Sequence, residues 1–196
     1  MAMEITSAQI KALRDETGIS VMQCKAALEE AGGDVEKARV ILRKKGAEAA
    51  SKKSDRTLGA GAIGAYVHST GEVAALVQLS CETDFVSKNE EFVALARDLA
   101  MHTAALAPRY VSRAEVDEAA LAAATAVFEG EVKDKPADLR EKILAGKLDA
   151  YFKDQILLEQ PFVKDPERSV NDLVEAATQK FGERVAVAAI SRLSVK

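Results

Sequence analysis

The apolar residues of segment 73–106 change their spacing near its middle. From Val73 to Cys81 they occupy every second position, which is the pattern of a strand with one buried face. From Phe92 to Leu106 they recur at every third or fourth position, which indicates a helix that packs along one side. The chain must therefore turn from a strand into a helix between these two runs.

The turn contains the sequence Thr-Asp-Phe-Val at residues 83–86. Ser87 and Glu90 have the spacing of a capping box, so we expect the helix to begin beside them and to leave the turn outside both regular elements. In one interpretation, Phe85 folds back as a hydrophobic anchor and Asp84 accepts backbone N–H groups. In the other, the turn presents a ring and a carboxylate to a partner.

Composition and charge exclude several classes of function. Hydrophobic residues make up 48% and charged residues 30% of the 196 residues, and no apolar run reaches the roughly 18 residues of a membrane span. The formal net charge is −4, which argues against nucleic acid as the main partner. The start of the chain lacks the features of a signal or transit peptide. We therefore expect a cytoplasmic protein with a protein partner and no membrane contact.

No set of residues has the spacing of a catalytic or metal site. Cys24 and Cys81 are far apart and lie on apolar faces, so we expect both in the core. His68 and His102 have neither a nucleophile nor a carboxylate at useful spacing. We therefore predict that the protein is not an enzyme and has no metal or cofactor of its own.

The glycines of residues 59–64 match the pattern of a dinucleotide-binding loop. Such a loop follows a strand and opens a helix, whereas a polar segment precedes these glycines and a second strand follows them. We interpret the glycines as part of the first strand of a hairpin, where they allow a neighbouring element to come close.

The first 46 residues predict a module of three helices. Each helical run follows a capping residue, namely Thr6, Ser20 and Asp34, and Gly46 is expected to end the third helix. Glutamine also follows Thr6 and Ser20 by three positions, as in a capping box.

A second domain is expected over residues 59–196. Residues 47–58 are small or charged and have no apolar face, so we predict a solvated linker there. Strands are expected near 62–68, 73–81 and 184–194. These elements predict an α+β fold with a three-stranded antiparallel sheet that helices cover on one face.

The remaining structural predictions for this domain concern helices and one extended segment. They are a helix from Lys88 to Ala107, an alanine-rich helix capped by Ser112 and Glu115, a polar break at 133–136, a helix from Ala137, an extended segment at 157–165 and a last helix between Ser169 and Gly182.

Three parts of the chain resemble the bacterial elongation factor Ts family. They are Cys-Glu-Thr-Asp-Phe-Val-Ser-Lys-Asn-Glu at 81–90, the two runs at 13–18 and 22–28, and the segment 157–165. The chain departs from the family pattern at five positions: Ile19, Ser20, Val21, Gln78 and Ser80. It also lacks the second lobe and the coiled coil of long members.

The resemblance implies a guanine-nucleotide exchange factor that acts on elongation factor Tu by protein contact. The first module would be of the ubiquitin-associated type and would dock on a helix of the GTPase. The residues implied in this contact, here named the docking surface, are Arg14, Val21 and Met22.

The resemblance also assigns the exchange activity to residues 83–86, here named the exchange corner. Phe85 would enter beside the magnesium and phosphate site of the partner, and Asp84 would perturb the magnesium shell. Thr83 and Val86 would hold the corner in shape. Short members of the family look as though they pair, which implies a homodimer.

A second function stays open at this point. Residues 28–38 also resemble the second half of a ubiquitin-associated domain. A helical adaptor that binds a protein partner through residues 1–46 would need no second domain.

Overall fold

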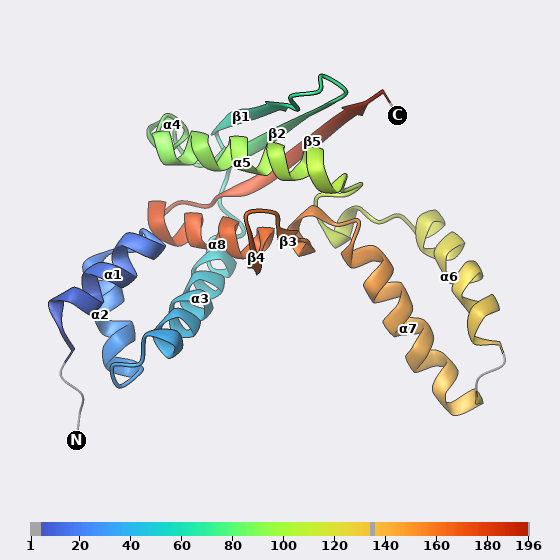
Figure 1. The fold of residues 1–196 in the computed structure, drawn as a ribbon, viewed down its shortest axis with the longest axis horizontal. Coiled ribbons are helices and arrows are strands. Elements are labelled where there is room, and N and C mark those ends of the chain that lie inside the picture. The colour runs from blue at the N-terminus through green and yellow to red at the C-terminus, as the bar shows by residue number, and fades with distance from the viewer. Residues whose placement is uncertain (1–4, 134–135, 196) are drawn as a thin grey trace.

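A three-stranded sheet and a set of helices make up the protein, which a computed structural model describes over residues 5–133 and 136–195 (Figure 1). The strands are β1 (Ala60–Val67), β2 (Val73–Cys81) and β5 (Ala186–Ser194), antiparallel in the order β1-β2-β5. This confirms the predicted α+β class and its sheet. Residues 1–4 of the predicted module, residues 134–135 of the predicted polar break and Lys196 lie outside the described residues.

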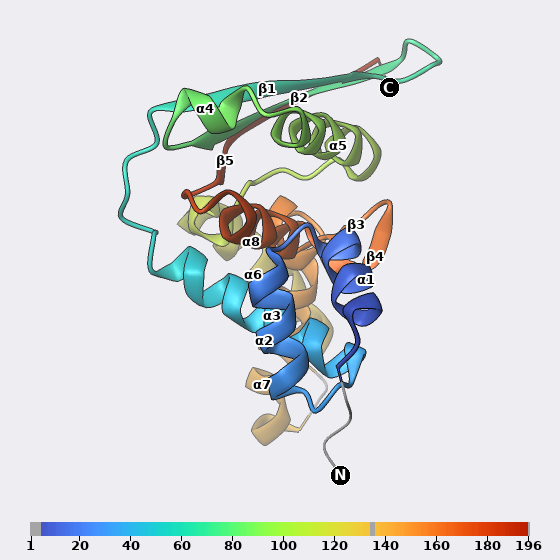
Figure 2. The same cartoon turned by 90° about the vertical axis from the view of Figure 1, so that its left-hand side faces the viewer.

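Helix α5 (Glu90–Leu106) covers one face of the sheet, as Figure 2 shows. Gly64 of β1 lies against this helix, and a Cβ atom at Gly64 would be 1.9 Å from the carbonyl oxygen of Ala96. Only glycine permits so close an approach. The glycines of 59–64 therefore serve strand packing, as predicted, and they open no helix.

The main core lies between the sheet, α5 and α8 (Val170–Phe181). Its fully buried side chains include Val77, Leu79, Phe92, Leu99 and Val170. The two predicted ends of α8 are confirmed, because Ser169 caps its start and Gly182 ends it with a left-handed backbone, φ 72°. Cys81 belongs to this core, and Cys24 to that of the N-terminal helices.

The N-terminal module consists of α1 (Ser7–Thr17), α2 (Val21–Glu30) and α3 (Val35–Ser51) around its own buried cluster. The predicted helix end at Gly46 is wrong, because α3 continues to Ser51 and includes the first residues of the predicted linker. Gly46 is a packing residue here, and a Cβ atom on it would be 3.7 Å from the backbone oxygen of Glu175 in α8. The module therefore packs on the core through α3.

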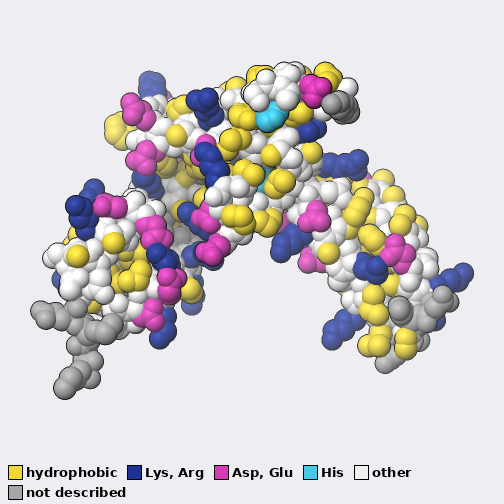
Figure 3. Space-filling view, viewed as in Figure 1, with side chains coloured by type: hydrophobic (Ala, Val, Ile, Leu, Met, Phe, Trp, Pro, Cys, Tyr) yellow, Lys and Arg dark blue, Asp and Glu magenta, His cyan; other side chains and the backbone are white. Residues whose placement is uncertain are grey.

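Helices α6 (Glu118–Val132) and α7 (Ala137–Lys153) form a hairpin that projects from the rest of the molecule (Figure 1). The space-filling view shows hydrophobic side chains along this projection (Figure 3). The predicted cap by Ser112 and Glu115 is wrong, because Asp117 caps α6 and accepts the N–H of Ala120 at 2.6 Å.

The segment predicted to be extended contains three short elements. They are a 3₁₀ turn, η2 (Leu157–Glu159), and two paired strands, β3 (Pro161–Phe162) and β4 (Asp165–Ser169). The prediction is therefore wrong for 157–159, where the amide of Glu159 bonds back to the carbonyl of Ile156 at 3.0 Å. Among the described residues, no helix is long and apolar enough to cross a membrane.

Candidate functional site

The exchange corner folds as a helix of one turn. This helix, α4 (Asp84–Ser87), follows β2 directly, and the hydroxyl of Ser87 donates to the carbonyl of Asp84 at 3.1 Å. The corner therefore lies outside both β2 and α5, as predicted, but it forms a short helix of its own, which was not predicted. The predicted start of α5 is wrong, because the side chain of Asn89 caps it and accepts the N–H of Glu91 at 2.9 Å.

Two neighbouring apolar side chains of α4 differ sharply in burial. Val86 is buried in the main core, whereas Phe85 is 83% exposed. The interpretation of Phe85 as a hydrophobic anchor is therefore wrong. A phenyl ring this exposed contributes little to folding and is typical of a contact site.

Asp84 lies beside Phe85 on the exposed side of the corner. Its carboxylate accepts a hydrogen bond from Lys88 at 2.7 Å, and both side chains are about three-quarters exposed. Lys88 holds the pKa of the Asp84 carboxyl below its usual range, so the group is anionic at neutral pH. An exposed ion pair of this kind is weak, so Asp84 can exchange Lys88 for another partner at little cost.

The docking surface flanks the turn between α1 and α2. Met22 and Val21 form the first turn of α2 and are 75% and 49% exposed, while Arg14 is an exposed residue of α1. Ser20 caps α2 as predicted, since its hydroxyl accepts the N–H of Gln23 at 3.4 Å. The side chains of Val21 and Met22 thus stand outside the core of their own module.

The docking surface and the exchange corner lie on the same side of the molecule. Figure 1 places α4 and the helices α1 and α2 at one end, and Figure 2 shows that end from the front.

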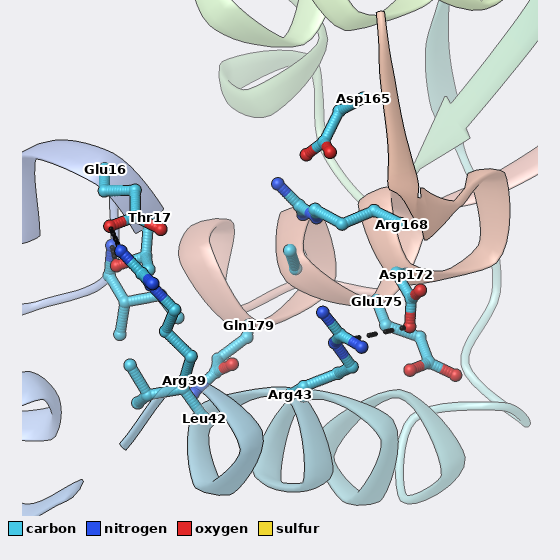
Figure 4. A pocket seen from close by; sticks show the side chains of 13 residues that line it. Glu16, Thr17, Arg39, Leu42, Arg43, Asp165, Arg168, Asp172, Glu175 and Gln179 are labelled. Atoms are coloured by element: carbon cyan, nitrogen blue, oxygen red, sulfur yellow. Dashed lines mark hydrogen bonds and ion pairs between the residues drawn. The ribbon is translucent and has the colours of Figure 1, made fainter. Parts of the chain in front are cut away.

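A cavity of about 220 Å³ lies elsewhere, between α1, α3, β4 and α8 (Figure 4). Four of its charged side chains form ion pairs across it: Arg39 bonds to Glu16 at 2.7 Å, and Arg43 faces Asp172 at 3.9 Å. No predicted site residue lines it. The residues that the structure describes include no cluster of three or more His, Cys, Asp or Glu able to hold a metal ion.

Sequence reasoning missed Glu183, which contacts the base of the exchange corner. Its carboxylate accepts the backbone N–H of Thr83 at 3.0 Å across a separation of 100 residues. No spacing or motif links the two positions, so only the tertiary structure reveals the contact.

Comparison with known proteins adds independent information. The family model described as Elongation factor TS matches residues 15–195. Elongation factor Ts of Geotalea uraniireducens is 44% identical over 195 residues, which cover 98% of this chain and 90% of that protein. Elongation factor Ts of Thermotoga petrophila is 44% identical over 193 residues, covering 98% and 97% of the two chains. The protein of the same name from Leptospira biflexa is 44% identical over 195 residues, covering 98% of each chain.

The family model extends across both the N-terminal helices and the sheet domain, and it includes the exchange corner and, of the docking surface, Val21 and Met22. The chain therefore belongs to the elongation factor Ts family of translation elongation factors.

Proposed function

We propose that this protein is a cytoplasmic guanine-nucleotide exchange factor for elongation factor Tu and acts by contact, without covalent chemistry. The observation that carries the proposal is the exchange corner itself. It presents an apolar ring, Phe85, and a carboxylate, Asp84, on a short helix whose Val86 is buried. Family membership supplies the partner.

The mechanism follows from thermodynamic linkage. If this protein binds the empty GTPase more tightly than the GDP-bound form, GDP must bind more weakly to the complex by the same factor. Magnesium requires near-ideal octahedral geometry, so a small displacement of its surroundings weakens both metal and phosphate binding. We assign this displacement to Phe85 and the perturbation of the magnesium shell to Asp84.

Thr83 and Val86 have a supporting role in this proposal. Val86 fixes the inner side of α4 in the main core, and Thr83 occupies the position just before the helix. Their task is to keep Phe85 and Asp84 at a constant angle to the partner.

The docking surface supplies affinity. Met22, Val21 and Arg14 are exposed while the residues beneath them are packed. Because the helix cap and the core of the module hold α2 in place, the backbone that carries Val21 and Met22 is preorganised for contact, which reduces the entropy cost of binding.

We also propose a homodimer, formed through the face of the sheet that α5 does not cover. In the described part of the chain no element lies over that face, as Figure 2 shows. The strand registers place uncharged residues on it: Ile63, Ala65, Val67, Ala74, Leu76, Gln78, Ser191 and Leu193. A two-fold interface brings the same patch together twice, so a face without charges meets its own copy without repulsion.

Sedimentation tests the dimer. The wild-type chain should sediment with about twice its 21.0 kDa mass, and Leu76→Lys at the centre of the face should sediment as a monomer, because a lysine would lie buried against its own copy. A wild-type monomer throughout the micromolar range would contradict the dimer and leave the exchange mechanism untouched.

The adaptor alternative assigns all binding to residues 1–46. Packing of α3 on α8 at Gly46 argues against it, because the module is joined to the core by more than a linker. In the adaptor alternative, removal of the second domain would spare partner binding.

Release of labelled GDP from elongation factor Tu tests the proposal directly. The protein should accelerate release in a saturable manner, while calorimetry should detect no micromolar binding of GDP, GTP or a dinucleotide to the protein alone. Acceleration absent at every concentration would overturn the proposal.

A further inference from the structure

The exchange corner lacks the local hydrogen bonds that usually hold a helix start. Thr83 stands at the N-cap position of α4, yet its side chain makes no capping bond to the helix. Threonine at an N-cap normally accepts a backbone N–H of the first turn. A helix of only four residues is also too short to be stable alone. Something outside the corner must therefore hold it.

The carboxylate of Glu183 fills this role in the structure. One oxygen, Oε2, accepts the backbone N–H groups of Glu82 and Thr83 at 3.1 and 3.0 Å. The other oxygen, Oε1, accepts the hydroxyl proton of Thr83 at 2.6 Å. Both oxygens of one carboxylate thus bind the base of α4, and hydrogen bonds to an ionised acceptor are the stronger kind.

A second carboxylate, that of Glu82, binds back to the segment that contains Glu183. Glu82 accepts the backbone N–H of Arg184 at 2.6 Å and a guanidinium N–H of Arg56 at 3.1 Å. Arg184 in turn donates to the carbonyl of Arg56 at 2.6 Å. The segments at 82–83 and 183–184 therefore exchange bonds in both directions, which fixes their relative position.

The end of α8 explains why Glu183 points at the corner. Gly182 ends the helix in the left-handed region, φ 72°, and its N–H bonds to the carbonyl of Thr178 at 3.1 Å. The N–H of Val185 then bonds to the Thr178 hydroxyl at 3.2 Å. Glu183 lies between Gly182 and Val185, whose backbone N–H groups both bond to Thr178. The backbone around Glu183 is therefore held in place without the partner.

We propose that Glu183 is a positioning residue of the exchange corner. Its carboxylate holds Thr83 so that α4 presents Phe85 and Asp84 in the geometry that the partner requires. This inference rests on the proposed exchange function and adds a residue to it. Preorganisation of this kind lowers the cost of forming the productive complex.

The structure offers variants that separate positioning from stability. Glu183→Ala removes all three bonds. Glu183→Gln removes the charge but keeps one oxygen for the two backbone N–H groups, and its amide can donate to the Thr83 hydroxyl. Thr83→Val removes the hydroxyl bond alone. Glu167→Ala, at an exposed position of β4, makes the same charge change outside the corner.

The measurement is the rate of GDP release from elongation factor Tu as a function of exchange-factor concentration. For Glu183→Ala we expect a maximum rate about tenfold lower and a half-saturating concentration within about twofold of wild type, because the docking surface is intact. Glu183→Gln should regain most of the rate, and Thr83→Val should lose a smaller part of it. Glu167→Ala should match wild type.

A double variant with Phe85→Ala tests whether Glu183 acts through the exchange corner. If Glu183 acts through the corner, Glu183→Ala should cost clearly less in a chain that already carries Phe85→Ala than in wild type, because only the positioning of Asp84 remains to be lost. Equal losses in both backgrounds would overturn the positioning role. A Glu183→Ala protein with wild-type maximum rate would overturn it as well, while a large effect of Phe85→Ala would leave the proposed exchange function standing.

A purely structural role gives a different pattern. It would lower the melting temperature of Glu183→Ala, raise its half-saturating concentration together with the loss of rate, and leave Glu183→Gln no better than Glu183→Ala. Should Glu183→Ala fail to fold, Glu183→Gln and Thr83→Val still decide the matter. A wild-type maximum rate in Thr83→Val at unchanged stability, or a maximum rate in folded Glu183→Gln far below that of wild type, would contradict the proposal.

Discussion

The docking surface and the exchange corner both expose large apolar side chains, but they are held in different ways. Met22 stands on a helix of ten residues that Ser20 caps and that packs inside its own module. Phe85 stands on a helix of four residues whose base is bound by Glu183, 100 residues away. Local sequence is therefore enough to shape the first surface, whereas the second depends on the fold of the whole core.

This difference matches two tasks in exchange. A contact that is equally good in the GDP-bound and empty states of the partner adds affinity and cannot drive release. A contact that differs between these states converts binding into release. A surface held by the packed core is suited to driving GDP release, because it can displace groups in the partner while keeping its own conformation.

The largest effect is expected for Phe85→Ala. Loss of the ring should lower the maximum rate of GDP release by roughly 5- to 150-fold, and Asp84→Ala should act in the same direction. Because Phe85 is exposed, the melting temperature should stay near that of wild type. The concentration dependence of GDP release measures this. An unchanged rate in a folded Phe85→Ala protein that still binds would remove Phe85 from the mechanism.

Met22→Ala should weaken the docking surface and leave the exchange corner intact. The half-saturating concentration should rise by roughly 5- to 30-fold, with little change in the maximum rate, because the lost contact is common to both states of the partner. Titration of GDP release separates the two parameters. If the maximum rate fell as strongly as with Phe85→Ala, the division between docking and exchange would be wrong.

Gly64→Ala should damage the core that carries the corner. The added Cβ would lie 1.9 Å from the carbonyl oxygen of Ala96, so β1 and α5 must move apart. Overpacking of this kind costs about 1–3 kcal/mol, which corresponds to a fall in melting temperature of roughly 2–12 °C. Thermal unfolding measures it. As a control, Gly71→Asn, where a Cβ would meet no atom within 4 Å, should be tolerated better, since asparagine accepts a positive φ. Equal stability of Gly64→Ala and wild type would mean that the sheet and helix are farther apart than described.

The smallest effect is expected for the pH dependence of the stability of the sheet domain. The Nδ1 atom of His102 accepts the N–H of Val163 at 3.2 Å, and Nε2 faces the Gln160 oxygen at 2.9 Å, so the neutral ring fits this site. Burial lowers the pKa of His102 below its usual value. The unfolded chain binds the proton more readily, so stability is full above about pH 6.5 and falls as the pH drops through that value.

Melting temperatures between about pH 7.5 and 5.5 test this. Wild type should lose stability over the range, and His102→Gln should lose less of it from a lower starting value. The N-terminal module has no histidine, so this titration concerns the core alone. Identical pH profiles for the two proteins would contradict the assignment to His102.

Much of this architecture could be predicted from spacing and capping residues. The alternation of apolar residues predicted β2, and their helical spacing predicted α5. The capping residues Ser20 and Ser169 predicted the starts of α2 and α8. These features are local, and local pattern is where sequence is most informative.

The errors have two sources: a tertiary contact that overrides or lacks a local signal, and the choice between two neighbouring capping residues. Gly46 was expected to end α3, yet it serves the packing of α3 on α8. Asn89 and Asp117 were better placed than Ser87 and Ser112 to cap the helices that follow. The contact of Glu183 with Thr83 has no local signature at all, so the residue that holds the exchange corner could not be predicted.

The most direct test of the account is the difference in affinity for the empty and GDP-bound forms of elongation factor Tu, measured by calorimetry for wild type, Phe85→Ala and Met22→Ala. That difference is the coupling that drives release. We expect Phe85→Ala to shrink the affinity ratio by roughly 5- to 150-fold, whereas Met22→Ala should weaken both affinities equally and leave the ratio as in wild type. A ratio that Phe85→Ala leaves unchanged, or that Met22→Ala reduces as much as Phe85→Ala does, would contradict this expectation.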